Sequence, residues 1–501
     1  APGAAAAGPY NILFLLTDQE RFFRPGELPA GFSLPAHERL LRQGTSFTNH
    51  RINSCVCTPS RSVVYTGRHI QQTGMFDNTN FPWMGSMSTE IDTVGDMLRA
   101  AGYYTAYKGK WHLTKEFETV NKLGSPTKIF TEEMEAYGFS DYFGIGDIIA
   151  HDRGGYLHDG IISAMGVNWL RGRGMELEAQ GKPWFLAVNL VNPHDIMFID
   201  TDRPGQPVQA KNILGHIRPE PSTPLYAKQW AFELPATYGQ RLDAPGRPAA
   251  HADYIRSHDA LVGNIPNEDW RWRRRHNYYL NCLRDVDRNI APLLDELDAL
   301  GLASKTIVVM TADHGDIDGA HRLHSKGATV YREQNNVPLV VVHPAFAGGK
   351  RCRAVTSHID IAPTLVGLTG VSALAVGAAH VLALTSGQTV WAWGENYYGQ
   401  LGDGTATLRQ TPVRVAGALQ GIRIKEVAAG NQYSLESVDI VVSESAYKGC
   451  SPMYSRAESA QQTPTASRSF TAGGCRLKQE GHAQRAPKRR TMAHRPSTAS
   501  C

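Results

Sequence analysis

The sequence predicts an α/β protein in which a large, mainly parallel β-sheet is flanked by helices. Residues 11–17 form a continuous apolar run, which is typical of a strand buried on both faces of such a sheet, and residues 183–190, 306–311 and 337–343 repeat the pattern. Two amphipathic stretches of helical period lie between these runs. Strands that alternate with helices in this way indicate an α/β sandwich.

Both predicted helices bury one face and end at a glycine. The first spans residues 91–101 and is followed by Gly102, which is a favourable C-terminal cap. The second opens with a basic run at residues 271–275, which we interpret as a solvated face. Its apolar stripe ends before Gly301 and comprises Tyr279, Leu283, Val286, Ile290, Leu293 and Leu297.

Polar residues follow three of the predicted strands directly. These are Asp18 with Gln19, the stretch at residues 192–195, and the stretch at residues 313–316. In open α/β sheets the ligand crevice lies outside the carboxyl ends of the strands. We therefore expect the three groups to converge on one site.

Length and composition predict a soluble protein of two or three structural units. The chain has 501 residues, 42% hydrophobic and 20% charged, and no apolar run reaches the length of a membrane span. Residues 443–501 carry ten Lys and Arg against three Asp and Glu, so the basic balance belongs to this tail and no nucleic-acid partner is expected. Seven cysteines form no disulfide framework, which leaves the compartment open between periplasmic or secreted and cytoplasmic.

The character of the chain changes after about residue 370. Residues 377–382 are echoed by residues 430–435, and a Val-Trp-Ala-Trp-Gly string lies between them. This stretch resembles one blade of the propeller repeats in regulator of chromosome condensation proteins. The predicted units are a flexible N-terminus (1–9), a catalytic domain (10–372), a short all-β, propeller-like segment (373–442) and a basic low-complexity tail (443–501) that we expect to be disordered.

The most specific motif begins at Cys57. It reads Cys-Thr-Pro-Ser-Arg and is followed by Thr-Gly-Arg at residues 66–68. Pro59 suits the first turn of a helix, so Cys57 should stand at a helix N-terminus, where free N–H groups attract an anion. The motif resembles the signature of type I sulfatases, and this resemblance implies an alkaline-phosphatase-like fold. It also implies that Cys57 is oxidised to formylglycine, whose hydrate has one hydroxyl to attack sulfur and another to expel sulfate.

The resemblance also implies a divalent metal site. Asp18, Gln19, Asp313 and His314 stand where the family places its metal ligands, and the modified Cys57 would join them. Carboxylate and amide oxygens favour Ca²⁺, while Mg²⁺ and, because of the histidine, Mn²⁺ are left open. Many sulfatases have Asp-Asp and Asp-Asn at these two places. The variants found here look more like the branch of phosphonate monoester hydrolases and choline sulfatases.

Further motifs supply groups that a sulfate transfer needs. The string at residues 109–112 and the stretch at residues 324–327 resemble family motifs in which Lys110 and Lys326 bind sulfate oxygens. His112 matches the residue that holds the formylglycine hydroxyl, and His194 matches the one beside the leaving-group oxygen. Arg61 lies one helical turn after Cys57 and should contact the metal carboxylates.

Two residues are predicted to touch the organic part of the substrate. The motifs together leave one predicted function and several alternatives. Asn78 and Trp83 come after the signature helix and could line the mouth of the site. The predicted function is hydrolysis of sulfate monoesters, arylsulfatase-like, after maturation by a formylglycine-generating enzyme. A phosphonate monoester or phosphodiester hydrolase, a choline sulfatase, and an inert hydrolase domain with a binding role are the alternatives. The oligomeric state is left open.

Overall fold

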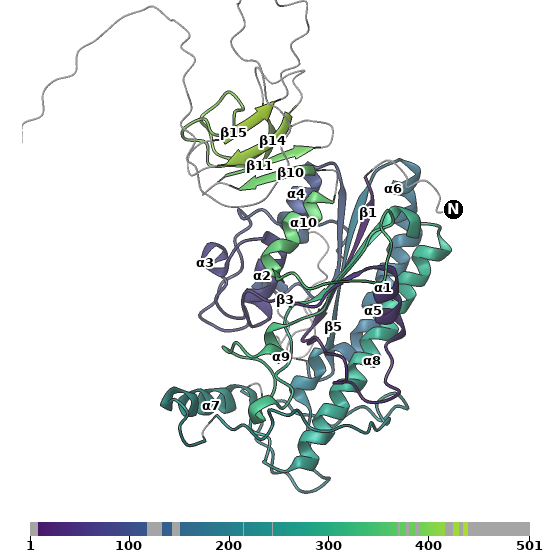
Figure 1. Ribbon diagram of the computed structural model, residues 1–501, viewed down its shortest axis with the longest axis vertical. Helices are drawn as coiled ribbons and strands as arrows, with labels where there is room; N and C mark the ends of the chain where they lie inside the picture. The colour runs from purple at the N-terminus through teal and green to yellow at the C-terminus, as the bar shows by residue number, and fades with distance from the viewer. Residues whose placement is uncertain are drawn as a thin grey trace, which may run out of the picture. The chain divides into compact units, whose positions relative to one another are not determined.

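A computed structural model describes most of the chain (Figure 1). The predicted flexible start and the predicted disordered tail lie outside the described residues, apart from Pro9. No helix in the described part of the chain combines the length and apolarity needed to cross a membrane. The described residues are 9–117, 133–142, 151–213, 215–242, 244–368, 371–376, 380–385, 390–415, 424–429 and 434–438.

The centre of the predicted first large unit, residues 10–372, is a mixed sheet with the strand order β4-β5-β1-β6-β7-β2-β8. Strands β4, β5, β1 and β6 are parallel, whereas β7 runs antiparallel to both β6 and β2. The mainly parallel sheet is therefore confirmed, although the apolar run at 337–343 forms an antiparallel strand. The strands are β1 (Asn11–Asp18), β2 (Thr45–Phe47), β4 (Tyr104–Gly109), β5 (Trp184–Pro193), β6 (Thr306–Ala312), β7 (Leu339–Val342) and β8 (Lys350–Cys352).

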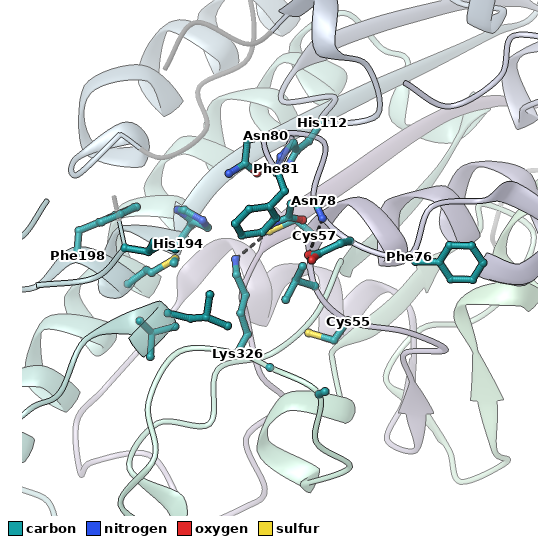
Figure 2. A pocket seen from close by; sticks show the side chains of 18 of the residues that line it. Cys55, Cys57, Phe76, Asn78, Asn80, Phe81, His112, His194, Phe198 and Lys326 are labelled. Atoms are coloured by element: carbon teal, nitrogen blue, oxygen red, sulfur yellow. Dashed lines mark hydrogen bonds between the residues drawn. The ribbon is translucent and has the colours of Figure 1, made fainter. Parts of the chain in front are cut away.

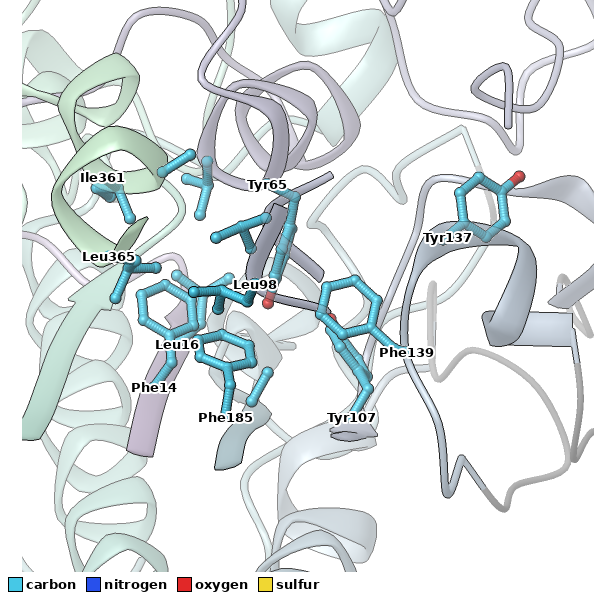
Figure 3. Close-up of a cluster of buried hydrophobic side chains, with 14 of the residues drawn as sticks. Phe14, Leu16, Tyr65, Leu98, Tyr107, Tyr137, Phe139, Phe185, Ile361 and Leu365 are labelled. Carbon is cyan, nitrogen blue, oxygen red and sulfur yellow. The ribbon is translucent and has the colours of Figure 1, made fainter. Parts of the chain in front are cut away.

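The apolar runs are continuous because the central strands are buried on both faces. In β1, Ile12, Phe14 and Leu16 pack into one core cluster, while Leu13 and Leu15 pack into a second on the opposite face. Figure 3 shows Phe14 and Leu16 in the first cluster. A sheet covered on both faces exposes its carboxyl edge as the place for a site.

Helices cover the two faces separately (Figure 1). Helices α2, α4 and α10 contribute Tyr65, Leu98 and Leu365 to one cluster, and α1, α5 and α8 contribute to the other. The helices are α1 (Pro35–Gln43), α2 (Cys57–Thr66), α3 (Ile70–Thr73), α4 (Val94–Ala100), α5 (Gly154–Trp169), α6 (Met175–Ala179), α7 (Ala249–Val262), α8 (Asp269–Ala299), α9 (Arg332–Asn335) and α10 (Ile361–Gly367). A π-helical turn, η3 (Leu170–Gly174), joins α5 to α6, and 3₁₀ turns are η1 (Lys115–Phe117), η2 (Glu133–Tyr137), η4 (His194–Phe198), η5 (Ala303–Lys305), η6 (Ala320–Arg322) and η7 (His358–Asp360).

Two helix predictions need correction. Helix α4 starts at Val94 and not at residue 91, because the Thr93 hydroxyl accepts the Gly95 N–H and caps the helix there. The basic run at the start of α8 is not a solvated face throughout. Arg271 is buried against Asp202, and Arg275 is buried against the carboxylate of Asp316 at 2.8 Å. Neighbouring acidic loops pack over this end of the helix and pair its guanidinium groups.

The C-terminal strands form antiparallel sheets of their own, as predicted. A small core of Leu382, Leu384, Val390, Ala392 and Leu401 lies among them, and Trp391 packs against the cluster that contains Phe14. The strands are β10 (Val371–Val376), β11 (His380–Thr385), β12 (Val390–Gly394) and β13 (Arg409–Arg414) in one sheet, and β14 (Ile424–Ala429) and β15 (Ser434–Val438) in another. A last short pair joins β3 (His50–Arg51) to β9 (Thr356–Ser357).

Candidate active site

Cys57 is the first residue of α2, and Pro59 lies in the first turn as predicted. Its neighbour Thr58 is held from two sides: the Thr58 N–H donates to Asn78 Oδ1 at 3.0 Å, and its hydroxyl donates to the His112 carbonyl at 2.7 Å. The Cys57 side chain is 1% exposed. The start of the helix, and with it the Cys57 sulfur, therefore has a fixed place at the carboxyl edge of the sheet.

The predicted metal ligands meet beside this sulfur. Asp18 ends β1, and Asp313 and His314 follow β6, its neighbour in the sheet. His314 Nε2 lies 3.3 Å from Cys57 Sγ, 3.8 Å from Asp18 Oδ1 and 3.7 Å from Asp313 Oδ1. All four side chains are buried, and one ligand atom from each lies within 4.8 Å of the others.

Arg61 forms ion pairs with both Asp18 and Asp313. Its Nε donates to Asp313 Oδ2 at 2.9 Å and its Nη2 to Asp18 Oδ2 at 3.1 Å, with no exposed surface on any of the three. Buried charges of this kind are stable only when paired. Arg61 holds the Oδ2 atoms, Asp18 Oδ1 faces His314 and the sulfur, and Asp313 Oδ1 accepts the N–H groups of Gln19 and His314.

Two lysines place positive charge around Cys57. Lys326 Nζ lies 2.8 Å from Cys57 Sγ, a hydrogen bond that is drawn as a dashed line in Figure 2. Lys110 Nζ lies 2.6 Å from Asp18 Oδ2 and 3.9 Å from the sulfur. Burial alone raises the pKa of the Cys57 thiol, and Asp18 adds to this. The two ammonium groups and His314 outweigh both and hold that pKa below its ordinary value. The site therefore favours negative charge at position 57.

We call the buried charged group at this edge the floor. It consists of Asp18, Gln19, Cys57, Arg61, Lys110, Asp313, His314 and Lys326. Three residues at or beside it have non-glycine backbone in the left-handed region: Gln19 at φ 71°, His112 at φ 59° and Ser325 at φ 60°. Such conformations persist only where the surroundings over-determine them, and they collect at functional sites.

The Gln19 amide provides a test of the metal hypothesis. Gln19 Nε2 donates to Asp316 Oδ2 at 2.6 Å, and Arg275 holds the same carboxylate. Within the described part of the chain, the buried Gln19 Oε1 has no hydrogen-bond partner. A buried carbonyl oxygen without a partner is costly unless a ligand satisfies it. This oxygen, together with carboxylates and an imidazole, fits a divalent cation. Sequence reasoning did not find the orienting role of Asp316.

Three members of the floor, Cys57, Lys110 and Lys326, line a cavity of about 500 Å³, and the other members lie behind them. His112 and His194 line it, and burial holds the pKa of each well below its ordinary value, so both are neutral at neutral pH. Asn78 and Trp83 also line the cavity. The side-chain oxygen of Asn78 accepts a hydrogen bond from the Thr58 N–H. Asn78 therefore positions the start of α2 in addition to facing the cavity.

Comparison with protein families identifies the chain. A cavity with buried cations and carboxylates at the carboxyl edge of an α/β sheet defines a site for an anionic ester, and the class concerned is the sulfuric ester hydrolases. The sequence model of the Sulfatase family matches residues 10–371, so the chain belongs to the sulfatase family. Models of the regulator of chromosome condensation (RCC1) repeat match residues 371–400 and 388–435.

Individual relatives are distant. The uncharacterized sulfatase YidJ of Escherichia coli is 27% identical, and an N-acetylglucosamine-6-O-sulfatase of Bacteroides thetaiotaomicron is 25% identical. Each alignment covers 72% of this chain and 68% of the relative.

Solved structures agree with the fold. A crystal structure of a Bacteroides thetaiotaomicron protein named as a sulfatase matches 77% of this chain and 85% of its own, with a TM-score of 0.54 at 18% identity. A phosphonate monoester hydrolase of Silicibacter pomeroyi matches 72% and 73%, with a TM-score of 0.50 at 19% identity. At these identities the likeness concerns the fold alone.

Proposed function

We propose that this protein hydrolyses sulfate monoesters with a formylglycine made from Cys57. The observation that carries the proposal is the position of Cys57. It begins a helix, lies 2.8 Å from the Lys326 ammonium group and adjoins a pair of carboxylates clamped by Arg61. A thiol buried for packing alone would not require two lysines and two aspartates around it.

Maturation requires a formylglycine-generating enzyme as a partner. The hydrated aldehyde would supply a nucleophilic hydroxyl and a second hydroxyl through which sulfate is released as the aldehyde re-forms. The pocket supports this use, because Lys326 lies next to position 57 and Thr58 is anchored on both sides. The substitution of oxygen for sulfur there calls for little additional room.

A divalent cation would be held by Asp18, Gln19, Asp313 and His314, with the oxygen at position 57 as a further ligand. When bound, it would neutralise charge on the transferred group and on the nucleophile. The hard oxygen donors favour Ca²⁺, and Mg²⁺ and Mn²⁺ are alternatives. The unpartnered Gln19 Oε1 is the observation in favour of this ligand set.

The protein's other groups divide the remaining work. Lys110 and Lys326 would bind the non-bridging oxygens of the sulfate, where fixed positive charge stabilises the transition state. His194 lines the cavity as a neutral imidazole, and its ring N–H would donate a hydrogen bond to the leaving-group oxygen, while His112 would hold the hydroxyl at position 57. Arg61 is a positioning residue, because its guanidinium contacts carboxylates and not the cavity.

A phosphonate monoester hydrolase is the second candidate, since Gln19 and His314 differ from the Asp-Asp and Asp-Asn pairs of many sulfatases. The test uses protein produced together with a formylglycine-generating enzyme. We expect 4-nitrophenyl sulfate to be hydrolysed with a higher kcat/KM than 4-nitrophenyl phenylphosphonate. Preference for the phosphonate would favour the second candidate, and hydrolysis of neither would point to a binding role.

A further inference from the structure

The cavity wall outside the floor is mainly apolar. This wall would contact the organic part of the substrate and so indicates its chemical class. We call six apolar side chains that line the cavity the mouth: Phe76, Phe81, Trp83, Phe198, Ile213 and Leu261. They come from the loop after α3, from η4, from a loop near residue 213 and from α7. Figure 2 shows Phe81, His194 and Lys326 arranged around Cys57.

Several members of the mouth are exposed to solvent although they are large and apolar. Phe76 is 60% exposed, Trp83 65%, Ile213 58% and Leu261 44%. Single exposed apolar residues are ordinary on protein surfaces, but a group around one cavity marks a binding surface. A ligand that enters the cavity from solvent past these exposed side chains would place its outer part against apolar surface. The mouth therefore favours a ligand whose outer part is apolar.

Two aromatic rings of the mouth lie face to face as a stack. Phe81 and Trp83 stack with their ring centroids 4.6 Å apart and their planes 7° apart. The indole N–H of Trp83 donates to Asp77 Oδ2 at 3.2 Å, and the Phe81 carbonyl accepts from Lys115 Nζ at 3.0 Å. Each ring uses one face on the other, and an outer face of the stack can take a flat ligand without much loss of side-chain entropy.

The described wall has few polar groups for a sugar. Outside the floor, and besides His112 and His194, the polar side chains on the described lining are Asp77, Asn78 and Asn80, apart from the weakly polar Cys55 thiol. Asp77 already accepts from Trp83 and from the Asn78 N–H, and Asn78 already accepts from Thr58. A buried sugar hydroxyl without a partner loses its hydrogen bond to water.

The charged side chains of the lining limit how many anionic groups the substrate can carry. Beyond Lys110 and Lys326 of the floor, the charged side chain on the described lining is the carboxylate of Asp77. A second sulfate on the substrate would meet an apolar or negatively charged wall. The cavity therefore matches one anionic group at its base and none at its mouth.

We propose that the substrates are singly charged sulfate esters of flat, apolar alcohols, with the ring system against an outer face of the Phe81–Trp83 stack, and that sulfated sugars are poor substrates. This rests on the proposed function, which supplies the sulfate ester and its orientation. Phe81, Trp83 and Leu261 are the specificity-determining side chains. The pocket, and not the reactivity of the leaving alcohol, makes the selection.

The test compares two primary alkyl sulfates, because their leaving groups are alike. We expect matured full-length protein to hydrolyse 2-(2-naphthyl)ethyl sulfate with a kcat/KM about 100-fold or more above that of glucose 6-sulfate. Trp83→Ala should raise KM for the naphthyl ester about tenfold and leave KM for methyl sulfate unchanged. Phe346→Ala, which removes an exposed aromatic side chain outside the cavity, is the matched control and should change neither.

Binding of 2-(2-naphthyl)ethanesulfonate, which has no ester bond to cleave, is measured in parallel by calorimetry. We expect it to bind about tenfold or more tightly than ethanesulfonate and to lose this advantage in Trp83→Ala. Equal affinities for the two sulfonates, or a higher kcat/KM for glucose 6-sulfate, would overturn the proposal that the mouth selects apolar substrates. Neither result would affect the sulfatase assignment. Tight sulfonate binding without hydrolysis of any sulfate ester would overturn the proposed function and support the mouth.

Discussion

The floor and the mouth of one cavity are made by different parts of the fold. Floor residues stand at or directly after the ends of β1, β4 and β6, in the first half of α2 and in the loop after η6, and each is buried. Mouth residues stand on loops, on η4 and on α7, and several are half exposed. The sheet fixes the geometry of the floor, whereas the mouth can change without disturbing the core. Chemistry and substrate choice should therefore respond to different substitutions.

Replacing the nucleophile should have the largest effect. Cys57→Ala removes the thiol-bearing side chain that is oxidised to formylglycine. We therefore expect kcat/KM to fall by more than about a thousandfold. The fold should survive, because Ala is a good residue at the start of a helix. Cys55→Ala is the matched control, since Cys55 also lines the cavity, and its rate should stay within a few-fold of the unsubstituted protein. Full activity in Cys57→Ala would end the sulfatase mechanism.

The metal ligands should come next. Asp313→Ala removes a carboxylate from the floor and unpairs Arg61, so we expect the bound divalent metal to fall to a small fraction of one per chain. Metal content is measured by mass spectrometry of the purified protein, and turnover is measured before and after chelation. Asp295→Ala, at a site 72% exposed on α8, is the control and should keep its metal. An unchanged rate in exhaustively metal-free protein would contradict the assigned ligand set.

A buried charged group outside the cavity should affect stability and not chemistry. His37 Nδ1 lies 2.6 Å from Asp287 and its Nε2 lies 3.1 Å from Glu20. Burial opposes the charged imidazole, but these carboxylates raise the pKa of His37 from 6.5 to about 10. The stabilisation is therefore complete below pH 6.5 and is lost as the pH rises through 10.

His37→Gln should consequently lower the thermal midpoint by several degrees at pH 6, and the difference from the unsubstituted protein should shrink toward zero by about pH 10. The measurement is a series of melting curves between these values. At pH 7 and well below the midpoint, kcat should be unchanged. A constant difference across the range would mean that packing, and not charge, explains the effect.

Removal of the tail should have the smallest effect. The described residues that line the cavity fall between Cys55 and Ala328. A chain ended after residue 442 should therefore keep its rate within a few-fold and its thermal midpoint. A chain ended after residue 372 should lose stability, because Trp391 packs against the core cluster that contains Phe14. Loss of turnover from the first truncation, in folded and matured protein, would show that the tail completes the site.

The sequence was sufficient to predict the sheet and the strand-end part of the floor because both follow local rules, whereas Lys110 and Lys326 were expected only from the resemblance to sulfatase motifs. Long apolar runs mark β1, β5 and β6, and polar residues directly after a parallel strand must lie at its carboxyl edge. Pro59 marked the first turn of α2. The antiparallel direction of β7 was not predictable, since a short apolar run has the same appearance in either direction.

The mouth and the support of Gln19 could not be predicted in the same way. Phe81 and Leu261 lie 180 residues apart in sequence, and no periodicity links a loop to a distant helix. Asp316 stands three residues beyond Asp313, but its hydrogen bond to Gln19 depends on how the loop after β6 folds back. Of the two residues predicted to touch substrate, Trp83 lies at the opening, and Asn78 is bonded to the start of α2.

The central claim concerns the chemical state of position 57, and a peptide mass tests it most directly. Trypsin should release residues 52–61, which contain Cys55 and Cys57, from protein produced together with a formylglycine-generating enzyme. We predict a mass lower by the difference between a thiol-bearing CH₂SH group and an aldehyde, with fragment ions that assign the change to position 57 and leave Cys55 intact. Turnover of sulfate esters by protein in which Cys57 is entirely the unmodified thiol would contradict the account.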